Sequence, residues 1–297
     1  MRVAQLTLDA IETAIEADQG AKYRGLLREL MPLAEDAYNP EEDGRRKHLG
    51  ASLLGRECPR ELWYVYRWAS QKRFSGRMLR LFNRGHLEEP RMIAALKLIG
   101  IQVWDKTAEG KQFRANFCSG HFGGSLDAIL KGVPEMPDVA MLGEFKTHNE
   151  KSFSKLKTDG VHFVKWEHMV QMIMYMGAYG LTHALYVAVN KNTDELYAEI
   201  IAFDKITYDR YFKRGMDILA ATEPPPRIHE NPSWYKCKMC DFHGICHGKG
   251  KITVSCRTCK KASPMDGGGW HCGHDGSVRD PEAQKLACPH YQIIPQL

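Results

Sequence analysis

The chain has 297 residues, of which 43% are hydrophobic and 26% charged, a composition typical of a globular protein that can bury a sizeable core. No apolar run approaches the roughly 20 residues that a membrane-spanning helix needs, and the N-terminal pattern is that of an acidic amphipathic helix, not of a signal peptide. Nine cysteines in such a chain favour metal ligands over a disulfide framework. We therefore expect a cytoplasmic protein of a bacterium, an archaeon or a phage-infected host, with no membrane partner.

Charge is distributed unevenly along the first hundred residues. Residues 1–43 carry ten acids against four bases, whereas residues 44–97 carry thirteen Lys and Arg against four Glu. The basic block interleaves arginine with tryptophan, tyrosine and phenylalanine, and this mixture suits a phosphate backbone with bases stacked beside it. A solvated helical face over a buried aromatic stripe is the alternative interpretation.

Hydrophobic periodicity predicts helices first along the chain, then strands, then a mixture of both. The predicted helices lie at residues 3–36, Ser52–Ala69, 84–100, 162–180 and 205–221. The predicted strands lie at Ile101–Lys106, Gln112–Cys118, His121–Leu130, Asp138–Lys146, 183–191 and 195–203. This order predicts an α/β (α+β) fold, in which a mixed central sheet is flanked by helices.

A proline-rich stretch, "EPPPRIHENP" at residues 223–232, ends this core, and the chain beyond it is rich in Cys, His and Gly. We predict four parts from these changes in composition. They are an N-terminal helical and basic region (1–84), a core (85–222), a first cysteine segment (223–250) and a C-terminal tail (251–297).

Two charged residues, Glu144 and Lys146, flank Phe145 in a predicted strand. Because side chains alternate along a strand, the two charges share one face and Phe145 lies on the other. A carboxylate and an ammonium on a covered face cost free energy unless they are paired, bind a metal or take part in catalysis. An isolated triplet of this kind also suits an exposed ion pair.

Further polar residues accompany this triplet in chain order. Glu89 lies on the helix predicted at residues 84–100, and Asp127 ends an apolar strand segment before the triplet. On the helix that follows, Gln171 and Tyr175 are four residues apart and therefore share a face. His148, just after the triplet, is expected to bond to the backbone, with contact to a substrate as the alternative.

This set of motifs resembles the PD-(D/E)XK nuclease superfamily, in its RecB-like and lambda-exonuclease-like branches, over about residues 50–220. The superfamily's motifs are a helix acid or histidine, a strand aspartate, an E-x-K triplet and a Q-x-x-x-Y helix, in this order. The helix position holds Glu89 here, as in the lambda-type enzymes, whereas RecB-like ones usually carry histidine. His86 and Glu88 are neighbours that stay open as alternatives.

The resemblance implies a restriction-endonuclease-like core and a metal-dependent DNA exonuclease. Hard cations take oxygen ligands, so Glu89, Asp127 and Glu144 are expected to hold one or two Mg²⁺ or Mn²⁺ ions. Lys146 is expected to orient or deprotonate the attacking water and to offset negative charge. Gln171 and Tyr175 are expected to position metal ligands or DNA.

The expected substrate is single-stranded DNA or a duplex end. The expected setting is recombination, repair or replication, with a partner protein from one of these processes, and a compact enzyme of this type suits a phage genome. A structure-selective endonuclease is one alternative. A DNA-binding or processing subunit of a larger complex is the other.

The first cysteine group, Cys237, Cys240 and Cys246, has the spacing C-x2-C-x5-C and lacks a fourth ligand. Cys58, before the core, can supply it. RecB-like nucleases of the CRISPR-adaptation and AddB type carry one cysteine before the core and three after it, and the resemblance therefore implies a 4Fe–4S cluster. Zinc is the alternative, with His243 or His247 completing the site.

The second group lies in the tail, where Cys256 and Cys259 form a C-x2-C pair and Cys272 follows. The fourth ligand is predicted to be Cys288, with His274 or His290 as alternatives. A C-x2-C pair with a distant second pair indicates zinc. The sequence thus predicts a zinc-ribbon-like appendage, which has either a structural role or a role in holding DNA.

Overall fold

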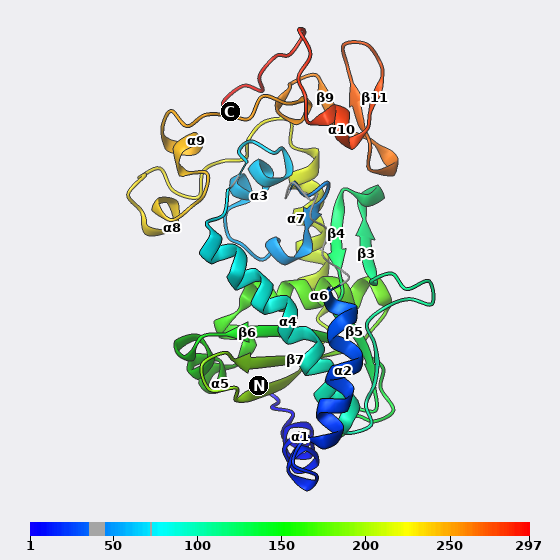
Figure 1. Ribbon diagram of the computed structural model, residues 1–297. Coiled ribbons are helices and arrows are strands. Elements are labelled where there is room, and N and C mark those ends of the chain that lie inside the picture. The colour runs from blue at the N-terminus through cyan, green and yellow to red at the C-terminus, as the bar shows by residue number, and fades with distance from the viewer. Residues whose placement is uncertain (36–44, 72) are drawn as a thin grey trace. The chain divides into compact units, whose positions relative to one another are not determined.

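The computed structural model describes residues 1–35, 45–71 and 73–297, which form two compact units (Figure 1). Within the described chain, the first unit holds residues 1–35, 74–115 and 125–208, and the second holds residues 45–71, 73, 116–124 and 209–297. Each unit is assembled from segments that are far apart in the sequence. The residues predicted to be catalytic all belong to the first unit, and the cysteines predicted to bind metal all belong to the second.

A five-stranded mixed sheet organises the first unit. Its strands lie in the order β2-β5-β6-β7-β8, and within it the β6–β7 pair is parallel and the other pairs are antiparallel. The strands are β2 (Gln102–Trp104), β5 (Ala128–Lys131), β6 (Met141–His148), β7 (His183–Asn190) and β8 (Leu196–Ala202). The predicted α/β class with a mixed sheet and flanking helices is therefore confirmed.

Helices pack on both faces of this sheet (Figure 1). α1, α2 and α4 belong to one face, where their apolar side chains join the main core, and α5 and α6 pack against β6, β7 and β8 on the other. The helices are α1 (Gln5–Ala17), α2 (Ala21–Glu35), α4 (Gly76–Leu98), α5 (Glu150–Val164) and α6 (Trp166–Tyr179).

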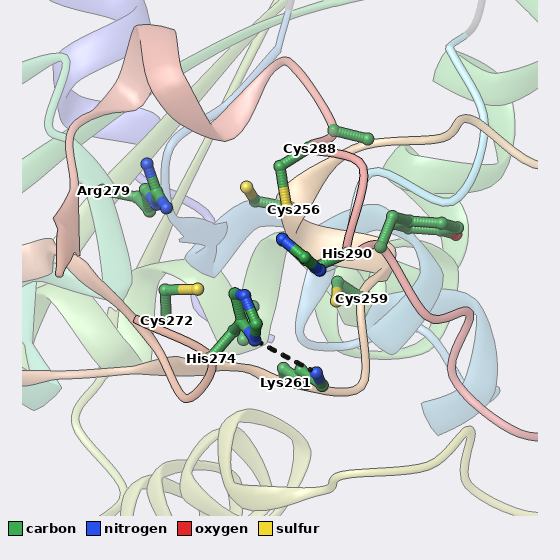
Figure 2. A pocket seen from close by; sticks show the side chains of 11 residues that line it. Cys256, Cys259, Lys261, Cys272, His274, Arg279, Cys288 and His290 are labelled. Carbon is green, nitrogen blue, oxygen red and sulfur yellow. Dashed lines mark hydrogen bonds between the residues drawn. The ribbon is translucent and has the colours of Figure 1, made fainter. Parts of the chain in front are cut away.

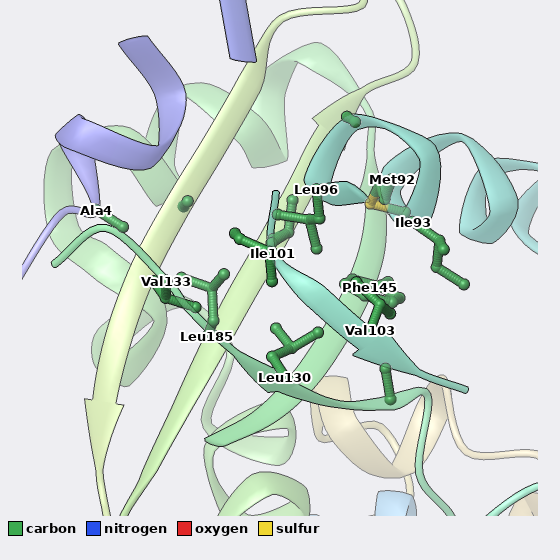
Figure 3. Close-up of a cluster of buried hydrophobic side chains, with 14 of the residues drawn as sticks. Ala4, Met92, Ile93, Leu96, Ile101, Val103, Leu130, Val133, Phe145 and Leu185 are labelled. Atoms are coloured by element: carbon green, nitrogen blue, oxygen red, sulfur yellow. The ribbon is translucent and has the colours of Figure 1, made fainter. Parts of the chain in front are cut away.

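The main core of the first unit lies between the sheet and α4 (Figure 3). Phe145 points into it from β6, together with Leu130 of β5 and Leu185 of β7, against Met92 and Leu96 of α4. This burial anchors β6 through its apolar face, since burying a side chain of this size contributes roughly 1.5–3 kcal/mol. The opposite face of β6, which carries Glu144 and Lys146, is thereby directed toward α6.

Local sequence signals set the ends of the helices around this sheet. The Ser75 side chain caps α4 by accepting a hydrogen bond from the amide of Met78, and Asn149 caps α5 in the same way through the amide of Ser152. α6 ends at Gly180, whose φ of 65° lies in the left-handed region that glycine adopts without strain. These caps fix where α5 and α6 begin and end beside the polar face of β6.

The second unit combines a small sheet, of order β1-β4-β3, with short helices and an antiparallel sheet, of order β11-β10-β9. The boundary between the two units falls within β3, β4 and α7. The strands are β1 (Leu49–Gly50), β3 (Arg114–Phe117), β4 (Phe122–Ser125), β9 (Ala262–Pro264), β10 (Trp270–Cys272) and β11 (Val278–Arg279). The helices are α3 (Pro59–Tyr66), α7 (Lys205–Ala220), α8 (Tyr235–Lys238), α9 (His243–His247) and α10 (Pro281–Gln284).

Some predicted elements differ from the structure, and one long helix was not predicted. The helix predicted at Ser52–Ala69 is shorter, because Pro59 starts α3 and residues 51–53 form a separate 3₁₀ turn. The strand predicted at His121–Leu130 is divided into β4 and β5, with Asp127 between them. The prediction missed α5, whose sequence is mostly polar and contains a glycine, Gly160, at a φ of 76°.

The predicted division at residues 84, 222 and 250 differs from the two compact units and stays a prediction. The C-terminal residues belong to the same compact unit as α3 and β4, so the structure does not separate a zinc-ribbon appendage from that unit. Among the helices of the described chain, none combines the length and apolar character needed to span a membrane.

Candidate active site

Glu144 and Lys146 form an ion pair on the polar face of β6. The Glu144 side chain is fully buried, whereas the Lys146 side chain keeps 23% of its surface exposed. Apart from the Lys146 ammonium, no donor in the described chain bonds either carboxylate oxygen of Glu144. The predicted shared face of the two charges is therefore confirmed, and the pair is buried, not an exposed cross-strand pair.

Asp127 completes the oxygen ring around the Lys146 ammonium. Lys146 Nζ lies 3.6 Å from Asp127 Oδ2 and donates a hydrogen bond of 3.0 Å to the main-chain carbonyl of Phe145. The same carboxylate oxygen of Asp127 accepts a 2.8 Å hydrogen bond from the amide of Phe145, which fixes Asp127 against β6. Three oxygens from three residues thus surround one cationic nitrogen.

Glu89 reaches this group from α4. It lies next to Pro90, whose missing N–H leaves α4 without one helical hydrogen bond at this point. Asp127 and Lys146 both act on its carboxyl electrostatically. Glu88, the neighbouring alternative, is instead buried against Arg91, at 3.3 Å. The geometry therefore favours Glu89 over Glu88 as the acid nearest the site.

The site holds more negative charge than Lys146 can balance. Burial, reinforced by the Asp127 carboxylate, raises the pKa of Glu89 to about 7, and burial also raises the pKa of Glu144. For Lys146, burial lowers the pKa, but Glu144 and Asp127 outweigh it and the net shift is upward. Lys146 therefore keeps its proton, while the carboxyls either take up protons or need another cation.

The two α6 residues of the motif lie over this polar face. Tyr175 is 2% exposed and contributes to the electrostatic environment of Lys146. Gln171, one turn earlier, is also buried. The structure thus brings Glu89, Asp127, Glu144, Lys146 and Tyr175 together, with Gln171 on the same helix.

The hydrogen bonds among three residues near this group were not predicted from the sequence. His148 bonds to the side chains of Ser152 and Tyr186, so the expectation that it bonds to the backbone was wrong. His168 of α6 also bonds to Tyr186. Alternation along β6 places His148 on the face of Lys146, and this signal could have been used, but the approach of Tyr186 depends on strand register.

The first cysteine group is assembled in the second unit. Cys58 caps α3, where it accepts a hydrogen bond from the amide of Glu61 at 3.4 Å. Burial raises the pKa of Cys237, and Cys246 and Cys58 add to this shift, so these three thiols are electrostatic neighbours. Cys58 also acts on Cys240. The structure therefore brings Cys58 to the cysteines that begin 179 residues later.

The two histidines predicted as alternatives to Cys58 differ from each other. His243 Nε2 bonds to the carbonyl of Pro232 at 3.1 Å, whereas His247 Nε2 is buried and has no hydrogen-bond partner in the described chain. The main-chain carbonyl of Cys246 is held by Arg227, at 2.7 and 3.0 Å.

The second cysteine group lines a pocket of the second unit (Figure 2). Its potential ligands are Cys256, Cys259, Cys272, Cys288, His274 and His290. The rings of His274 and His290 are 3.9 Å apart, and Lys261 donates a hydrogen bond to His274 Nδ1 at 3.4 Å. All the predicted ligands, including both alternatives to Cys288, thus gather around one pocket.

None of these groups has the geometry of a closed metal site. Across residues 1–35, 45–71 and 73–297, no three His, Cys, Asp or Glu side chains are placed so that they could hold one metal ion. The donor types still fit the predicted groups. Two carboxylates and a carbonyl already bind a cation, the Lys146 ammonium. The thiols of the first group are electrostatic neighbours, and those of the second line one pocket.

Comparison with known proteins finds no family model and no curated protein that matches the chain. Solved structures that resemble it include LHK-Exo in complex with dAMP, with 16% identity and a TM-score of 0.42 over 60% of this chain and 89% of that chain. An alkaline exonuclease (LHK-Exo) from Laribacter hongkongensis has 18% identity and a TM-score of 0.43, over 59% and 88%. SSO0001 has 17% identity and a TM-score of 0.37, over 77% and 97%.

The raised pKa of Glu89 predicts how the stability of the metal-free protein depends on pH. Between the ordinary value of 4.5 and about 7, the unfolded chain releases this proton while the folded chain keeps it. The stability contributed by Glu89 is therefore complete below pH 4.5 and is lost as pH rises to about 7. We expect Glu89→Gln to flatten this decline in urea unfolding with EDTA present.

The stabilisation by added Mg²⁺ should have the opposite pH dependence in the same urea unfolding experiment. A cation favours the ionised carboxyls, so it should raise the wild-type unfolding midpoint more at pH 8 than at pH 5. Identical pH profiles for the wild type and Glu89→Gln would contradict the placement of Glu89 beside Asp127.

Proposed function

We propose that the protein is a metal-dependent DNA exonuclease of PD-(D/E)XK type, acting on single strands or duplex ends in recombination, repair or replication. One observation carries this proposal. The Lys146 ammonium is held by Glu144, Asp127 and the Phe145 carbonyl on a buried face, with Glu89 adding a third carboxyl beside them. A buried group with this excess of negative charge is suited to divalent cations and costs free energy without them.

The residues that would hold Mg²⁺ or Mn²⁺ are Asp127, Glu144 and Glu89. A bound ion of this kind supplies acidification of the attacking water and stabilisation of charge on the phosphate. Asp127 is already oriented for this role, because the Phe145 amide fixes one of its oxygens. Glu144 offers two buried oxygens that have no other donor than Lys146.

Lys146 supplies a fixed positive charge in this proposal. Because the carboxylates raise its pKa, it is an ammonium in the metal-free protein, and as an ammonium it donates hydrogen bonds to an attacking water. It therefore orients that water and offsets negative charge that develops on the phosphate. Of the two predicted roles, orientation and deprotonation, the electrostatics support orientation.

The contact with DNA is proposed to come from α4 and from Arg73, three residues before its first residue. Arg77, Arg80 and Arg84 are exposed on the first half of this helix, and Arg73 is exposed before it. Phe74 and Phe82 are also partly exposed, and their rings pack edge to face with centroids 5.0 Å apart. Since α4 also carries Glu89, one helix joins a basic, aromatic surface to the candidate site.

We further propose a 4Fe–4S cluster on Cys58, Cys237, Cys240 and Cys246, and a zinc ion on Cys256, Cys259, Cys272 and Cys288. The mutual electrostatic influence of the first four thiols supports the cluster. Lys261 and Arg279 line the pocket of the second group, and their positive charges suit a zinc tetrathiolate, whose net charge is negative. His247 stays open for zinc in the first group, and His274 and His290 stay open in the second.

Two other functions are compatible with the same site. A structure-selective endonuclease would use the same carboxylates on internal bonds, and a DNA-binding or processing subunit would use the basic surface within a larger complex. Incubation with Mg²⁺ or Mn²⁺ separates the three. Degradation of linear DNA alone supports the exonuclease, and cutting of closed circles supports the endonuclease. If the protein cleaves neither substrate, the DNA-binding or processing subunit is supported.

Loss of a site residue should abolish cleavage and leave DNA binding intact. Glu144→Gln and Lys146→Ala should each lower the cleavage rate of end-labelled linear DNA by at least about 100-fold, because each removes preorganised charge at the phosphate. Glu89→Gln should act similarly. The matched control is Glu88→Gln, one residue away on α4, which should cleave at nearly the wild-type rate.

DNA affinity of the same variants, measured by fluorescence anisotropy, should stay within about threefold of wild type, since phosphate contacts are spread over many basic residues. Wild-type cleavage by Glu144→Gln or Lys146→Ala would remove the active-site assignment. Equal loss in Glu88→Gln and Glu89→Gln would show that the effect comes from α4 as a whole.

Charge reversal on α4 should weaken binding and flatten its salt dependence. The double variant Arg77→Glu/Arg80→Glu should lose roughly 0.9 log units of slope for each phosphate contact removed from duplex DNA. The control is Lys22→Glu/Arg28→Glu, which makes the same charge change at exposed positions of α2. If both double variants give the same affinity and slope, the α4 arginines form an ordinary solvated face.

Metal content should separate the two cysteine groups. Anaerobically purified protein is expected to be brown and to contain about four iron atoms together with zinc. Cys58→Ala should lose iron and unfold more easily, because the cluster closes a very long loop. Cys256→Ala should lose zinc and keep iron. The control is Cys118→Ala, at a cysteine that belongs to neither group, which should keep both metals. Colourless protein with zinc alone would defeat the cluster proposal, whereas the carboxylate site would be unaffected.

A further inference from the structure

A chain of four hydrogen-bonded side chains lies beside the candidate active site, and no step proposed above uses it. Ser152 Oγ and His148 Nδ1 are 3.0 Å apart, His148 Nε2 and Tyr186 Oη are 2.8 Å apart, and Tyr186 Oη and His168 Nδ1 are 2.9 Å apart. Tyr186 is fully buried and stands at the centre of this chain. Its hydroxyl contacts both histidines.

Strand register places this chain next to the ion pair. In the parallel β6–β7 pair, Tyr186 is the direct partner of Glu144. His148 follows Lys146 by two residues on β6 and therefore shares its face. Tyr186 and His148 thus flank the Glu144–Lys146 pair, one across the sheet and one along the strand.

The same chain connects α6 to that face. His168 precedes Gln171 by three residues and Tyr175 by seven, so the three side chains lie along one side of α6. The His168 ring also stacks on Tyr186, with centroids 5.8 Å apart and an interplanar angle of 30°. The helix that places Tyr175 near Lys146 is therefore attached to the sheet through the Tyr186 hydroxyl.

The chain is held in one protonation state. Burial lowers the pKa of both His148 and His168, and the nearby ammonium groups of Lys146 and Lys165 lower both further. Burial also keeps the Tyr186 hydroxyl protonated. With neutral rings, the single hydroxyl proton is donated to one histidine, and the other histidine donates its N–H to Oη. All the polar atoms at the centre are satisfied without a net charge being added next to Lys146.

We propose that Tyr186 is a positioning residue, whose hydroxyl joins α6 to β6 through His168 and His148 and so holds Glu144 and Lys146 in register with the helix above them. This inference rests on the proposed function, because both the cleavage and the cation that Asp127 and Glu144 would hold belong to that proposal. Mn²⁺ affinity is measured without DNA and therefore separates an effect on the carboxylate site from an effect on cleavage. Neighbours that orient ligands typically change metal affinity or activity by about 10–100-fold when they are lost.

The test is Tyr186→Phe, which keeps the ring and removes the hydroxyl. We expect kcat on linear DNA to fall by about 10–100-fold while KM stays within about threefold, and the Mn²⁺ affinity measured by electron paramagnetic resonance to fall by about tenfold. The matched control is Tyr197→Phe. Tyr197 is also buried in this sheet, but its hydroxyl donates to Glu199 at 2.8 Å and does not join α6 to β6.

The control should keep wild-type kcat and Mn²⁺ affinity, and thermal unfolding should show that both variants are folded at the assay temperature. His168→Phe alone and combined with Tyr186→Phe should lower kcat by similar factors, since the effects of substitutions within one hydrogen-bonded chain of side chains are not additive. Unchanged values in Tyr186→Phe, or equal losses in Tyr186→Phe and Tyr197→Phe, would overturn the proposal. If the wild type cleaves no DNA, the nuclease proposal fails, and Mn²⁺ affinity alone then decides on Tyr186.

Discussion

The buried ion pair of Glu144 and Lys146 is the constraint around which the first unit is organised. A carboxylate with no exposed surface is stable only if positive charge compensates it, and here one ammonium serves Glu144, Asp127 and the Phe145 carbonyl at once. Glu89 adds a further carboxyl that this ammonium cannot balance. The neutral state of His148 and His168 follows from the same charge, because the lysines around them oppose a second cation. Binding of a divalent cation would relieve the remaining imbalance.

The second unit, in contrast, buries positive charge. Arg67 and Arg257 are almost fully buried, and burial lowers the pKa of Arg257 to about 9 and that of Arg67 to about 10. Trp270 lies 4.8 Å from the guanidinium carbon of each, and Arg257 donates to the carbonyl of Tyr66 and to Gln284. Arg257 stands between two of the cysteines proposed to bind zinc, so the negative charge of a tetrathiolate would compensate these cations. Cys58 caps α3, and the carbonyl of its last residue, Tyr66, accepts a hydrogen bond from the same arginine. α3 therefore links the two cysteine groups within one compact unit.

Much of the candidate site was predictable from the sequence because its residues follow local rules. Alternation in a strand puts Glu144 and Lys146 on one face whatever the rest of the fold does, and helical spacing does the same for Gln171 and Tyr175. The contrast between Glu88 and Glu89 was not predictable, since both have the same chemistry and lie one residue apart. Packing decided it, by turning Glu88 toward Arg91 and Glu89 toward Asp127. α5 was missed for a related reason. Its polar sequence carries little periodic signal, and Asn149 alone does not identify the start of a helix.

The sequence by itself therefore determined the α/β class, the mixed order of helices and strands, the shared face of the charged triplet and the two groups of cysteines. These properties depend on composition, period and short spacing, all of which act within a few residues. Only the tertiary structure decided that Tyr186 meets Glu144 and that one ammonium is shared by two carboxylates and a carbonyl. Such contacts join segments distant in the chain, and they are selected by strand register and by the free energy of burying charge, which no local pattern of residues encodes.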